Sequence, residues 1–492
     1  MEAFPHQMAE KAPIILWFRK DLRLSDHAGL SAAIHSGHPV IPVYIHHPKL
    51  NGRLTGGASN WWLHHSLKSM EDDLKKIGGI LILRMGEPGP ILAEFCKHTK
   101  ACAVYASQGY EPEMNAMDLR LSNQMEQVGI QWKCFPGHLL WKPESIRNKS
   151  GKPFQVFTPF WKTASQTLKT SAPLPAPDHW PAPTKWPKSV SLNEFKLLPK
   201  IKWDAGFSKV WNPGEKGALK NLQRFTLDAF QDYPKKRDFP GIAGTSRLSP
   251  HLHFGEITPN QILHECIRHG SGNGVSESAI TQSTYMREIG WREFAHHLLH
   301  YFPSTTQKPL RPEFNSFPWR KDHEMLETWQ KGKTGYPIVD AGMRELWTTG
   351  WMHNRVRMIV GSFLVKHLLL DWKEGEKWFW DTLVDADLAN NTLGWQWIAG
   401  CGADAAPYFR IFNPITQSEK FAGDGEYVRK WVPELKSLPT AYLHAPWKAD
   451  KSILKSSDIE LGKTYPEPIV NHMIARETAL DAYQRMKSGQ MK

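Results

Sequence analysis

The stretch from residue 351 to residue 413 combines long apolar runs with charged and amide side chains. Its run MIVGSFLVKHLLL indicates burial, yet the same stretch holds seven polar residues among aromatic ones: Asn354, Arg355, Arg357, Asp385, Asp387, Asn390 and Asn391. Buried charges and amides cost free energy unless they pair with each other or with a polar ligand. The pattern fits a large ligand that is part apolar and part hydrogen-bonding, and it equally fits an interior salt-bridge network in a helical core.

A second candidate is the segment GTSRLSPHLHFGEITP at 244–259. It places hydroxyls, an arginine and a glycine just before a helical pattern that begins with proline. Hydroxyls and free backbone N–H groups near a helix start can hold an anion such as a phosphate. A plain helix-capping sequence would have the same spacing, so both interpretations stay open.

The elements that precede these segments alternate between strand and helix. Short β-rich runs occupy 13–19, 39–47, 79–86, 103–108 and 130–136, and helical patterns lie between them at 26–37, 59–78, 87–98 and 111–129. This alternation predicts βαβ units and a doubly wound parallel sheet. No G-x-G-x-x-G follows a strand, so ordinary dinucleotide binding is not supported. Tyr110 and Glu111 follow a strand end, where such sheets bind ligands, although plain surface residues also occur there.

Regular patterning fades from about 141 to 215, where six prolines fall between Pro173 and Pro187. We interpret this segment as a long connection over the surface, and hence as a domain boundary. Helical patterns then fill the chain from about 216 to 480, which predicts an all-α fold. We therefore predict an α/β domain at 1–140, a linker at 141–215 and an all-α domain at 216–492.

The composition favours a globular protein of the cytoplasm. The chain of 492 residues is 41% hydrophobic and 22% charged, with no apolar run long enough for a membrane span and no signal peptide at its start. Five cysteines without C-x-x-C spacing predict reduced thiols and no metal site. The net charge of +12, concentrated between 141 and 240, mildly favours nucleic acid as a partner. The 22 tryptophans mostly serve packing, but a few can carry electrons or stack on bases.

Several long motifs occur in an order that resembles the photolyase/cryptochrome family. They run from WFRKDLRLSDH at 17–27, through TSRLSP and WMHNRVRM, to WVPEL at 431–435. The resemblance implies that the α/β domain holds an antenna pigment, a folate or a deazaflavin, and that the helical domain binds FAD. Under this interpretation Tyr110 and Glu111 would face the antenna.

The resemblance assigns a flavin-binding role to two groups of residues. In the first, Tyr233 contacts the cofactor and a loop holds its diphosphate, made of Thr245, Ser246, Arg247, Leu248 and Ser249. In the second, Arg357 pairs with Asp385 beneath the isoalloxazine ring. Asp387 contacts FAD on the side of its ribose or adenine. Asn354 lies on the same helical face as Arg357.

Asn391 matches the position that faces flavin N5. A neutral amide can donate or accept a hydrogen bond, so it suits a reduced, anionic flavin. The resembled plant and insect light sensors tend to carry Asp or Cys at this position. Asparagine therefore favours repair over signalling.

Three tryptophans, Trp395, Trp372 and Trp319, match the family's electron-transfer residues in the motifs GWQW, DWKEG and FPW. Electron hopping needs a contiguous series of oxidisable aromatic rings whose outermost member lies near solvent. Each tryptophan alone would be interpreted as packing. Their joint occurrence in the family motifs favours a path from the flavin to the surface.

The same resemblance implies a pocket for a pyrimidine dimer flipped out of DNA. Glu288 would hydrogen-bond the dimer, and we expect a desolvated site that raises its pKa so that it can donate. Trp291 and Trp397 would pack against the dimer, and Met358 would lie beneath it. The predicted DNA contacts are Arg237, Arg292, Asn354, Arg355 and Gln417. Binding through phosphates should weaken with salt.

The motif WMHNRVRM separates branches of the family. Repair enzymes for (6-4) photoproducts carry a histidine pair at this helix, whereas Asn354 and Met358 look like the cyclobutane-dimer enzymes. The segments at 285–303 and 390–414 resemble the bacterial class III group, which implies methenyltetrahydrofolate as the antenna. Tyr285 departs from the tryptophan of class I enzymes, which puts a dimer contact there in doubt.

These features predict a monomeric, light-driven lyase that acts on damaged DNA without a membrane or an obligate protein partner. Reduced FAD would pass one electron to a cyclobutane pyrimidine dimer, whose two ring bonds split before the electron returns. A cryptochrome-type photoreceptor is the first alternative, and Asn391 and the lack of a long C-terminal tail argue against it. A light-independent flavin oxidoreductase is the second, for which no nucleotide fingerprint is visible.

Overall fold

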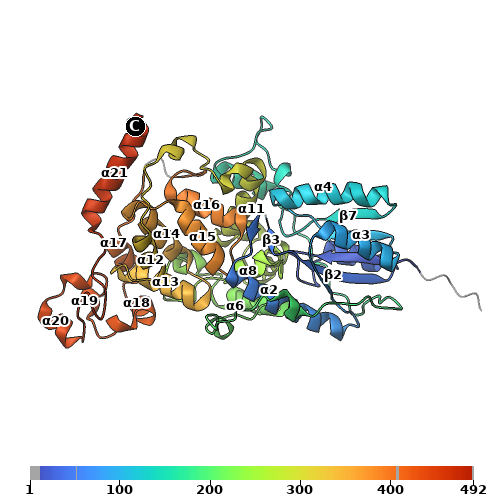
Figure 1. The fold of residues 1–492 in the computed structure, drawn as a ribbon, viewed down its shortest axis with the longest axis horizontal. Coiled ribbons are helices and arrows are strands. Elements are labelled where there is room, and N and C mark those ends of the chain that lie inside the picture. Colours follow the sequence, from blue (N-terminus) through green and yellow to red (C-terminus); the bar gives the residue numbers. More distant parts are fainter. Residues whose placement is uncertain (1–10, 51, 406–408, 490–492) are drawn as a thin grey trace, which may run out of the picture.

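The computed structural model describes residues 11–50, 52–405 and 409–489. A sheet with its helices forms one end of the molecule, and a larger helical part forms the other (Figure 1). Residues 1–10 lie outside these ranges. They make up most of the N-terminal segment for which the sequence predicts no signal peptide. Within the described ranges, no helix has both the length and the apolar character that a membrane crossing requires.

Five parallel strands form the sheet: β1 (Ile14–Phe18), β2 (Val40–His46), β5 (Ile82–Met85), β6 (Ala103–Ser107) and β7 (Gln131–Phe135). Their order is β5-β2-β1-β6-β7, so the chain winds outward from β1 in both directions. Ile14 lies opposite Val40 on one side and Ala103 on the other. The connecting helices are α1 (Ala28–His35), α2 (Gly57–Lys76), α3 (Pro88–Thr99) and α4 (Pro112–Gln127). The predicted doubly wound parallel sheet is confirmed.

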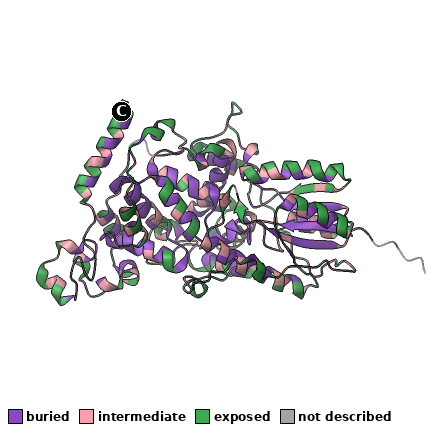
Figure 2. Ribbon diagram, viewed as in Figure 1, coloured by how far each residue is buried: buried purple, intermediate pink, exposed green. Residues whose placement is uncertain are grey.

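The central strand β1 shows why these residues form a sheet covered on both faces. Leu16 and Phe18 pack in one core with residues of α1 and α2, while Ile15 and Trp17 pack in another with residues of α3 and α4. Successive side chains of a strand point to opposite faces, so a strand between two helical layers must be apolar throughout, as IILWF is. Each such buried side chain contributes about 1.5–3 kcal/mol. The edge strand β7 is more exposed (Figure 2).

The core of α1 and α2 continues into the helical part of the molecule. It includes Trp62 of α2 together with Phe254, Trp351 and Val384. The Trp62 indole N–H donates to the Glu256 carboxylate across 2.9 Å, and the Trp62 side chain is completely buried. The sheet-bearing part and the helical part therefore share a core.

The predicted linker contains a helix that we did not expect. Helix α5 (Phe157–Gln166) buries Phe157, Phe160 and Trp161 in a core with residues of α11. Its apolar positions are close in sequence to prolines and other loop-forming residues, which hides the helical period. The expectation of a connection lying wholly over the surface is thus wrong, and the three-part division of the chain stays a prediction. The structure also adds a small hairpin, β3 (Lys49–Leu50) with β4 (Arg53–Leu54), whose strands are too short to predict.

The helical part agrees with the sequence patterns. Its helices are α6 (Glu215–Asp228), α7 (Tyr233–Lys236), α8 (Ser249–His253), α9 (Pro259–Gly272), α10 (Glu277–Thr281), α11 (Thr284–Tyr301), α12 (His323–Gln330), α13 (Pro337–Thr349), α14 (Asn354–Ser362), α15 (Trp372–Thr382), α16 (Leu388–Ala399), α17 (Pro414–Phe421), α18 (Glu426–Trp431), α19 (Thr440–Leu443), α20 (Lys451–Ser456) and α21 (His472–Ser488). After α14 the chain continues as a π-helical turn, Phe363–His367. Helices α14, α15 and α16 carry several of the residues singled out above, among them Arg357, Trp372 and Asn391.

Candidate functional site

The two candidate segments meet at one ion pair. Arg357 on α14 donates from Nη2 to both carboxylate oxygens of Asp385, at 3.0 and 2.8 Å. The hydroxyl of Ser249, the first residue of α8, donates to the same carboxylate at 2.6 Å. The backbone oxygen of Met352 accepts from Arg357 Nε at 2.8 Å and fixes the direction of the guanidinium. The structure therefore brings the loop at 245–249 and the segment at 354–391 together, which spacing alone could not show.

The loop at 245–249 presents a partly buried cation. Arg247 has a φ of 55°, in the left-handed region that non-glycine residues rarely adopt. Its guanidinium lies 4.7 Å from the centre of the Trp351 ring. Burial lowers the pKa of Arg247 from its ordinary value, because its charge is poorly solvated. A strained backbone that supports a poorly solvated cation is typical of a site for an anionic ligand.

Asp387 stands at the start of α16, as the helix N-cap. Its carboxylate accepts from the Asn390 backbone N–H at 2.9 Å and from the Asn390 side-chain amide at 2.6 Å. The rings of His253 and His296 approach the same carboxylate at 3.8 and 3.6 Å. Burial lowers the pKa of His296 to about 3, so this ring is neutral. Asp387 thus positions the helix that carries Asn391.

The side chain of Asn391 is held in one orientation. Its Nδ2 donates to the Glu376 backbone oxygen at 3.0 Å and to Glu376 Oε1 at 3.2 Å, across the α15–α16 contact. An amide group has two N–H donors and one acceptor oxygen, and both donors are used by Glu376. The group that Asn391 can offer a ligand is therefore its oxygen, a hydrogen-bond acceptor.

The three tryptophans run from the core toward the surface. Trp395 on α16 is 1% exposed, and its ring lies directly against the backbone of α15 at Gly375. Trp372 begins α15 three residues before Gly375 and is also buried. Trp319 is partly exposed. The backbone N–H of the next residue, Arg320, donates to the Leu369 backbone oxygen at 2.7 Å, which places Trp319 near the start of α15. This order from buried to exposed is the one that a path for electrons requires.

Comparisons with known proteins show which protein family this chain belongs to. Two family models match, DNA photolyase over residues 14–178 and the FAD binding domain of DNA photolyase over residues 285–485. A deoxyribodipyrimidine photo-lyase from Agrobacterium fabrum is 50% identical over 480 residues, which cover 97% of this chain and 98% of that protein. The chain belongs to the DNA photolyase family. The family resemblance predicted from the motifs is confirmed.

Relatives within this family include proteins named photolyase and proteins named cryptochrome. The crystal structure of a bacterial class III photolyase from Agrobacterium tumefaciens has a TM-score of 0.94 at 49% identity, covering 99% of this chain and all of that one. Cryptochrome-2 of Arabidopsis thaliana is 38% identical, over 97% of this chain and 79% of that protein. The likeness to the class III group confirms the branch predicted from the sequence.

The residues present fit FAD, as expected of a DNA photolyase. Within the described ranges, buried polar atoms without a hydrogen-bond partner around the site include the Tyr285 hydroxyl, His353 Nε2 and Trp395 Nε1. An unsatisfied buried polar group costs about 1–3 kcal/mol, so a ligand that pairs with such groups is favoured. Arg247 and the hydroxyls beside it suit a diphosphate, and the acceptor oxygen of Asn391 suits a protonated ring nitrogen. Tyr233 packs edge-on against the Tyr285 ring at 5.1 Å, which places α7 at the same site.

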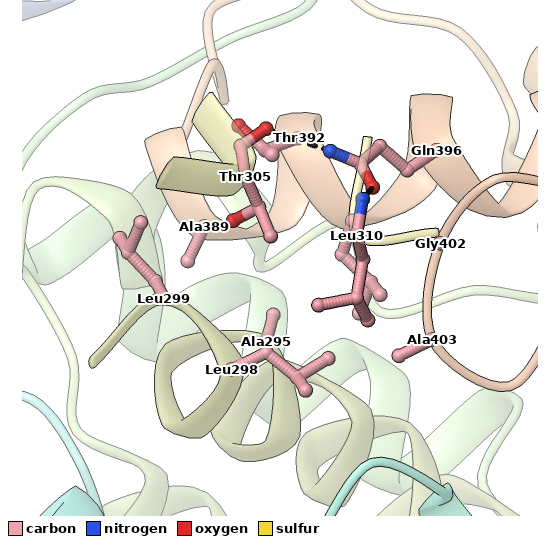
Figure 3. A pocket seen from close by; sticks show the side chains of 11 residues that line it. Ala295, Leu298, Leu299, Thr305, Leu310, Ala389, Thr392, Gln396, Gly402 and Ala403 are labelled. Carbon is pink, nitrogen blue, oxygen red and sulfur yellow. Dashed lines mark hydrogen bonds between the residues drawn. The ribbon is translucent and has the colours of Figure 1, made fainter. Parts of the chain in front are cut away.

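A small cavity between α11 and α16 is a packing gap and not a cofactor site (Figure 3). Its volume is about 20 Å³, room for one water molecule at most. Gln396 closes it by donating to the Thr305 backbone oxygen at 2.7 Å and accepting from the Leu310 N–H at 2.9 Å. The cavity therefore belongs to the scaffold that holds α16 in place.

A larger open cleft of about 560 Å³ includes Arg355 of α14, the helix that carries the predicted flavin residue Arg357. Two of the predicted DNA contacts, Arg355 and Gln417, line it. Sequence reasoning missed the rest of its lining, which comes from three separate segments: Lys235, Asp238, Phe239, Arg410, Phe412, Lys420 and Phe421. The Arg355 guanidinium pairs with Asp238 at 2.8 Å and lies 4.4 Å from the centre of the Phe421 ring. Cations over aromatic walls suit a phosphate backbone and its bases.

Glu288 lies close to this cleft but differs from our expectation. Its carboxylate pairs with Arg237, and 30% of the side chain stays exposed, so the site is not desolvated as we expected. One turn further along α11, the Trp291 ring stacks on Phe157, with ring centres 3.8 Å apart. The Met358 sulfur lies 3.8 Å from Nη1 of the Arg355 guanidinium. Trp397 is partly exposed on α16. Photolyase residues predicted for the lesion thus come from α11, α14 and α16.

Three predicted contacts lie elsewhere in the structure. Arg292 donates to the backbone oxygens of His138 at 2.9 Å and Leu252 at 3.4 Å, and its side chain is 11% exposed. Because its donors are used by these backbone oxygens, we no longer expect it to contact DNA. Tyr110 and Glu111 are buried, not plain surface residues. The Tyr110 hydroxyl accepts from a backbone N–H at 3.1 Å and Glu111 pairs with a lysine, so their contact with an antenna stays a prediction.

Proposed function

We propose that this protein is a light-driven DNA repair lyase that splits cyclobutane pyrimidine dimers. The observation that carries the proposal is a chain of ion pairs that leads from Glu288 to Arg355, on the helix that also carries Arg357. Glu288 pairs with Arg237, Arg237 approaches Asp238 at 3.8 Å, and Asp238 pairs with Arg355, two residues before Arg357 on α14. A dimer flipped out of the duplex into this cleft would therefore lie beside the helix that carries Arg357. The name of the relative that is 50% identical supports the same reaction.

When bound and reduced, FAD would supply the light-excited electron for splitting the two carbon–carbon bonds of the dimer, with no net oxidation or reduction. The protein's own residues hold the partners in place. Arg247 and the hydroxyls of its loop hold the diphosphate, and the Arg357–Asp385 pair supports the ring. Asn391 offers an acceptor to the protonated ring nitrogen.

The lesion would be held by residues from three helices. Glu288 lies within reach of a base in the cleft and can stabilise the charge that develops on it. Trp291, Trp397 and Met358 provide apolar walls, which exclude water from the dimer. The DNA backbone would contact Arg237 and Arg355, with Asn354 and Gln417 beside them.

The remaining assignments follow from the same proposal. Trp395, Trp372 and Trp319 would carry electrons from the surface to oxidised FAD. The class III likeness supports methenyltetrahydrofolate as antenna, held by the α/β domain at residues 1–140. The DNA substrate implies action inside the cell, and we propose that the protein acts as a monomer.

The decisive experiment is repair of an oligonucleotide that carries one thymine dimer. Protein loaded with FAD and fully reduced should restore both thymines under blue light and not in the dark. Glu288→Ala should lower the repair yield per photon while the flavin absorbance stays unchanged. No repair by fully reduced wild-type protein would contradict the proposal and favour a photoreceptor, the second candidate that the 38% identity to Cryptochrome-2 supports.

A further inference from the structure

The short hairpin β3–β4 connects the sheet-bearing part of the molecule to helix α15. The Trp380 indole N–H donates to the Leu54 backbone oxygen at 2.9 Å, and the Gly57 N–H donates to Asp381 at 2.8 Å. A Cβ at Gly56 would lie 2.1 Å from the Trp380 backbone oxygen, so the two segments approach as closely as backbones can. The hairpin is therefore held rigidly against α15.

This contact places Arg53 beside a buried carboxylate. Arg53 Nη1 lies 2.6 Å from Glu376 Oε1, and Nη2 donates to the Thr306 backbone oxygen at 3.2 Å. The Glu376 side chain is 4% exposed, whereas that of Arg53 is 32% exposed. Burial raises the pKa of Glu376 from its ordinary value, and Arg53 and Asn391 oppose that rise. Among the described residues, Arg53 is the charged group that faces this carboxylate and Asn391 is the polar one.

The state of the Glu376 carboxyl contributes to how Asn391 is presented, beside the Glu376 backbone oxygen, which accepts from the same amide nitrogen at 3.0 Å. An ionised carboxylate only accepts hydrogen bonds, so it holds the amide nitrogen of Asn391 toward α15 and leaves the amide oxygen for the cofactor side. A protonated carboxyl can itself donate, and a donor there would bond to the amide oxygen instead. Protonation of Glu376 would therefore permit the reversed orientation of Asn391.

We propose that Arg53 is a positioning residue for the light-driven reaction, acting through Glu376 to fix the orientation of Asn391. Arg53 keeps Glu376 ionised, and the ionised carboxylate keeps the Asn391 oxygen directed at the cofactor. The inference rests on the proposed function, because it assigns its effect to the residue beside the flavin. It also gives the sheet-bearing part of the molecule a direct effect on the chemistry of the helical part.

The test compares Arg53→Met with Arg53→Lys, which keeps a positive charge, and with Glu376→Gln, which cannot ionise. Asp381→Ala is the matched control, because it removes another tie between the same two segments without touching Glu376. Infrared spectroscopy of each purified protein reports the protonated carboxyl of Glu376 as a function of pH, through a band that Glu376→Gln lacks. The repair yield on a thymine-dimer oligonucleotide is measured over the same pH range.

We expect Arg53→Met to raise the pH at which Glu376 protonates by about 1–3 units. Its repair yield should fall below that pH and recover above it, while Arg53→Lys should behave like the wild type. Glu376→Gln should be impaired at every pH. An unshifted carboxyl band in Arg53→Met, or a loss that matches Asp381→Ala at every pH, would overturn the inference. If the wild type itself repairs nothing, the proposed function fails, and the infrared titration still decides whether Arg53 controls Glu376.

Discussion

The contact between Gly375 and Trp395 can be tested with one added methyl group. A Cβ on Gly375 would lie 2.1 Å from the Trp395 ring, whereas carbon atoms in favourable contact are about 3.5–4.0 Å apart. The ring cannot move away freely, because it is 1% exposed and packs against Phe379 with ring centres 4.9 Å apart. Overpacking a core destabilises a fold by about 1–3 kcal/mol. Replacing glycine with alanine inside a helix stabilises the fold by about 1 kcal/mol, because alanine has the higher helix propensity. We expect Gly375→Ala to destabilise the fold by about 2 kcal/mol, since this overlap belongs to the severe end of the range.

Urea denaturation of the protein without flavin measures this loss, and photoreduction of bound FAD reports whether Trp395 has moved. Gly394→Ala is the matched control, because it makes the same change on the neighbouring helix α16 where no atom lies within 4 Å of the new Cβ. Gly394→Ala should stabilise the fold, by up to about 1 kcal/mol. The two variants should therefore move the denaturation midpoint in opposite directions. Equal stabilities for both variants would refute the reasoning.

Three further outcomes are expected. Trp372→Phe should slow photoreduction of oxidised FAD and spare repair by protein that is already reduced; loss of both activities would indicate structural damage instead. Burial raises the pKa of Glu293 from 4.5 to about 7, so ionising it in the fold is unfavourable and stability should fall as the pH rises through that window. Glu293→Gln should remove this fall, as measured by urea midpoints at about pH 5 and about pH 8. Arg355→Gln should weaken binding to dimer-containing DNA and reduce the slope of log affinity against log salt by about 1, as measured by titration at several salt concentrations.

Local patterns were sufficient to predict the sheet and most helices. The run IILWF is short and rich in β-branched and aromatic residues, which favours a buried strand. Strands of this kind that alternate with helices leave few possible topologies. Helix α5 was missed because its sequence FTPFWKTASQ has a proline in its first turn and adjoins a proline-rich segment. The hairpin at Arg53 was missed because strands of two residues are too short to show an alternation of apolar and polar side chains.

Contacts within the site were predictable where the family motifs contain both partner residues. Contacts between residues outside those motifs were not. The pair of Arg357 with Asp385 was expected from family motifs and is present. Lys235 and Lys420 line the cleft but are 185 positions apart in the sequence, so only tertiary packing unites them. The direction of a side chain was also beyond the sequence, as with Arg292, whose guanidinium turns toward backbone oxygens and away from the cleft.

The core that α2 shares with the helical part removes any hinge between the two halves of the molecule. Separating them would bring the Trp62 indole into water and leave the Glu256 carboxylate without its donor. A pigment attached to the sheet would therefore keep a constant separation and tilt relative to the flavin, and both quantities govern how efficiently excitation passes between two dyes. Cutting the chain into its halves should yield two insoluble fragments, because each would expose one side of a common interior.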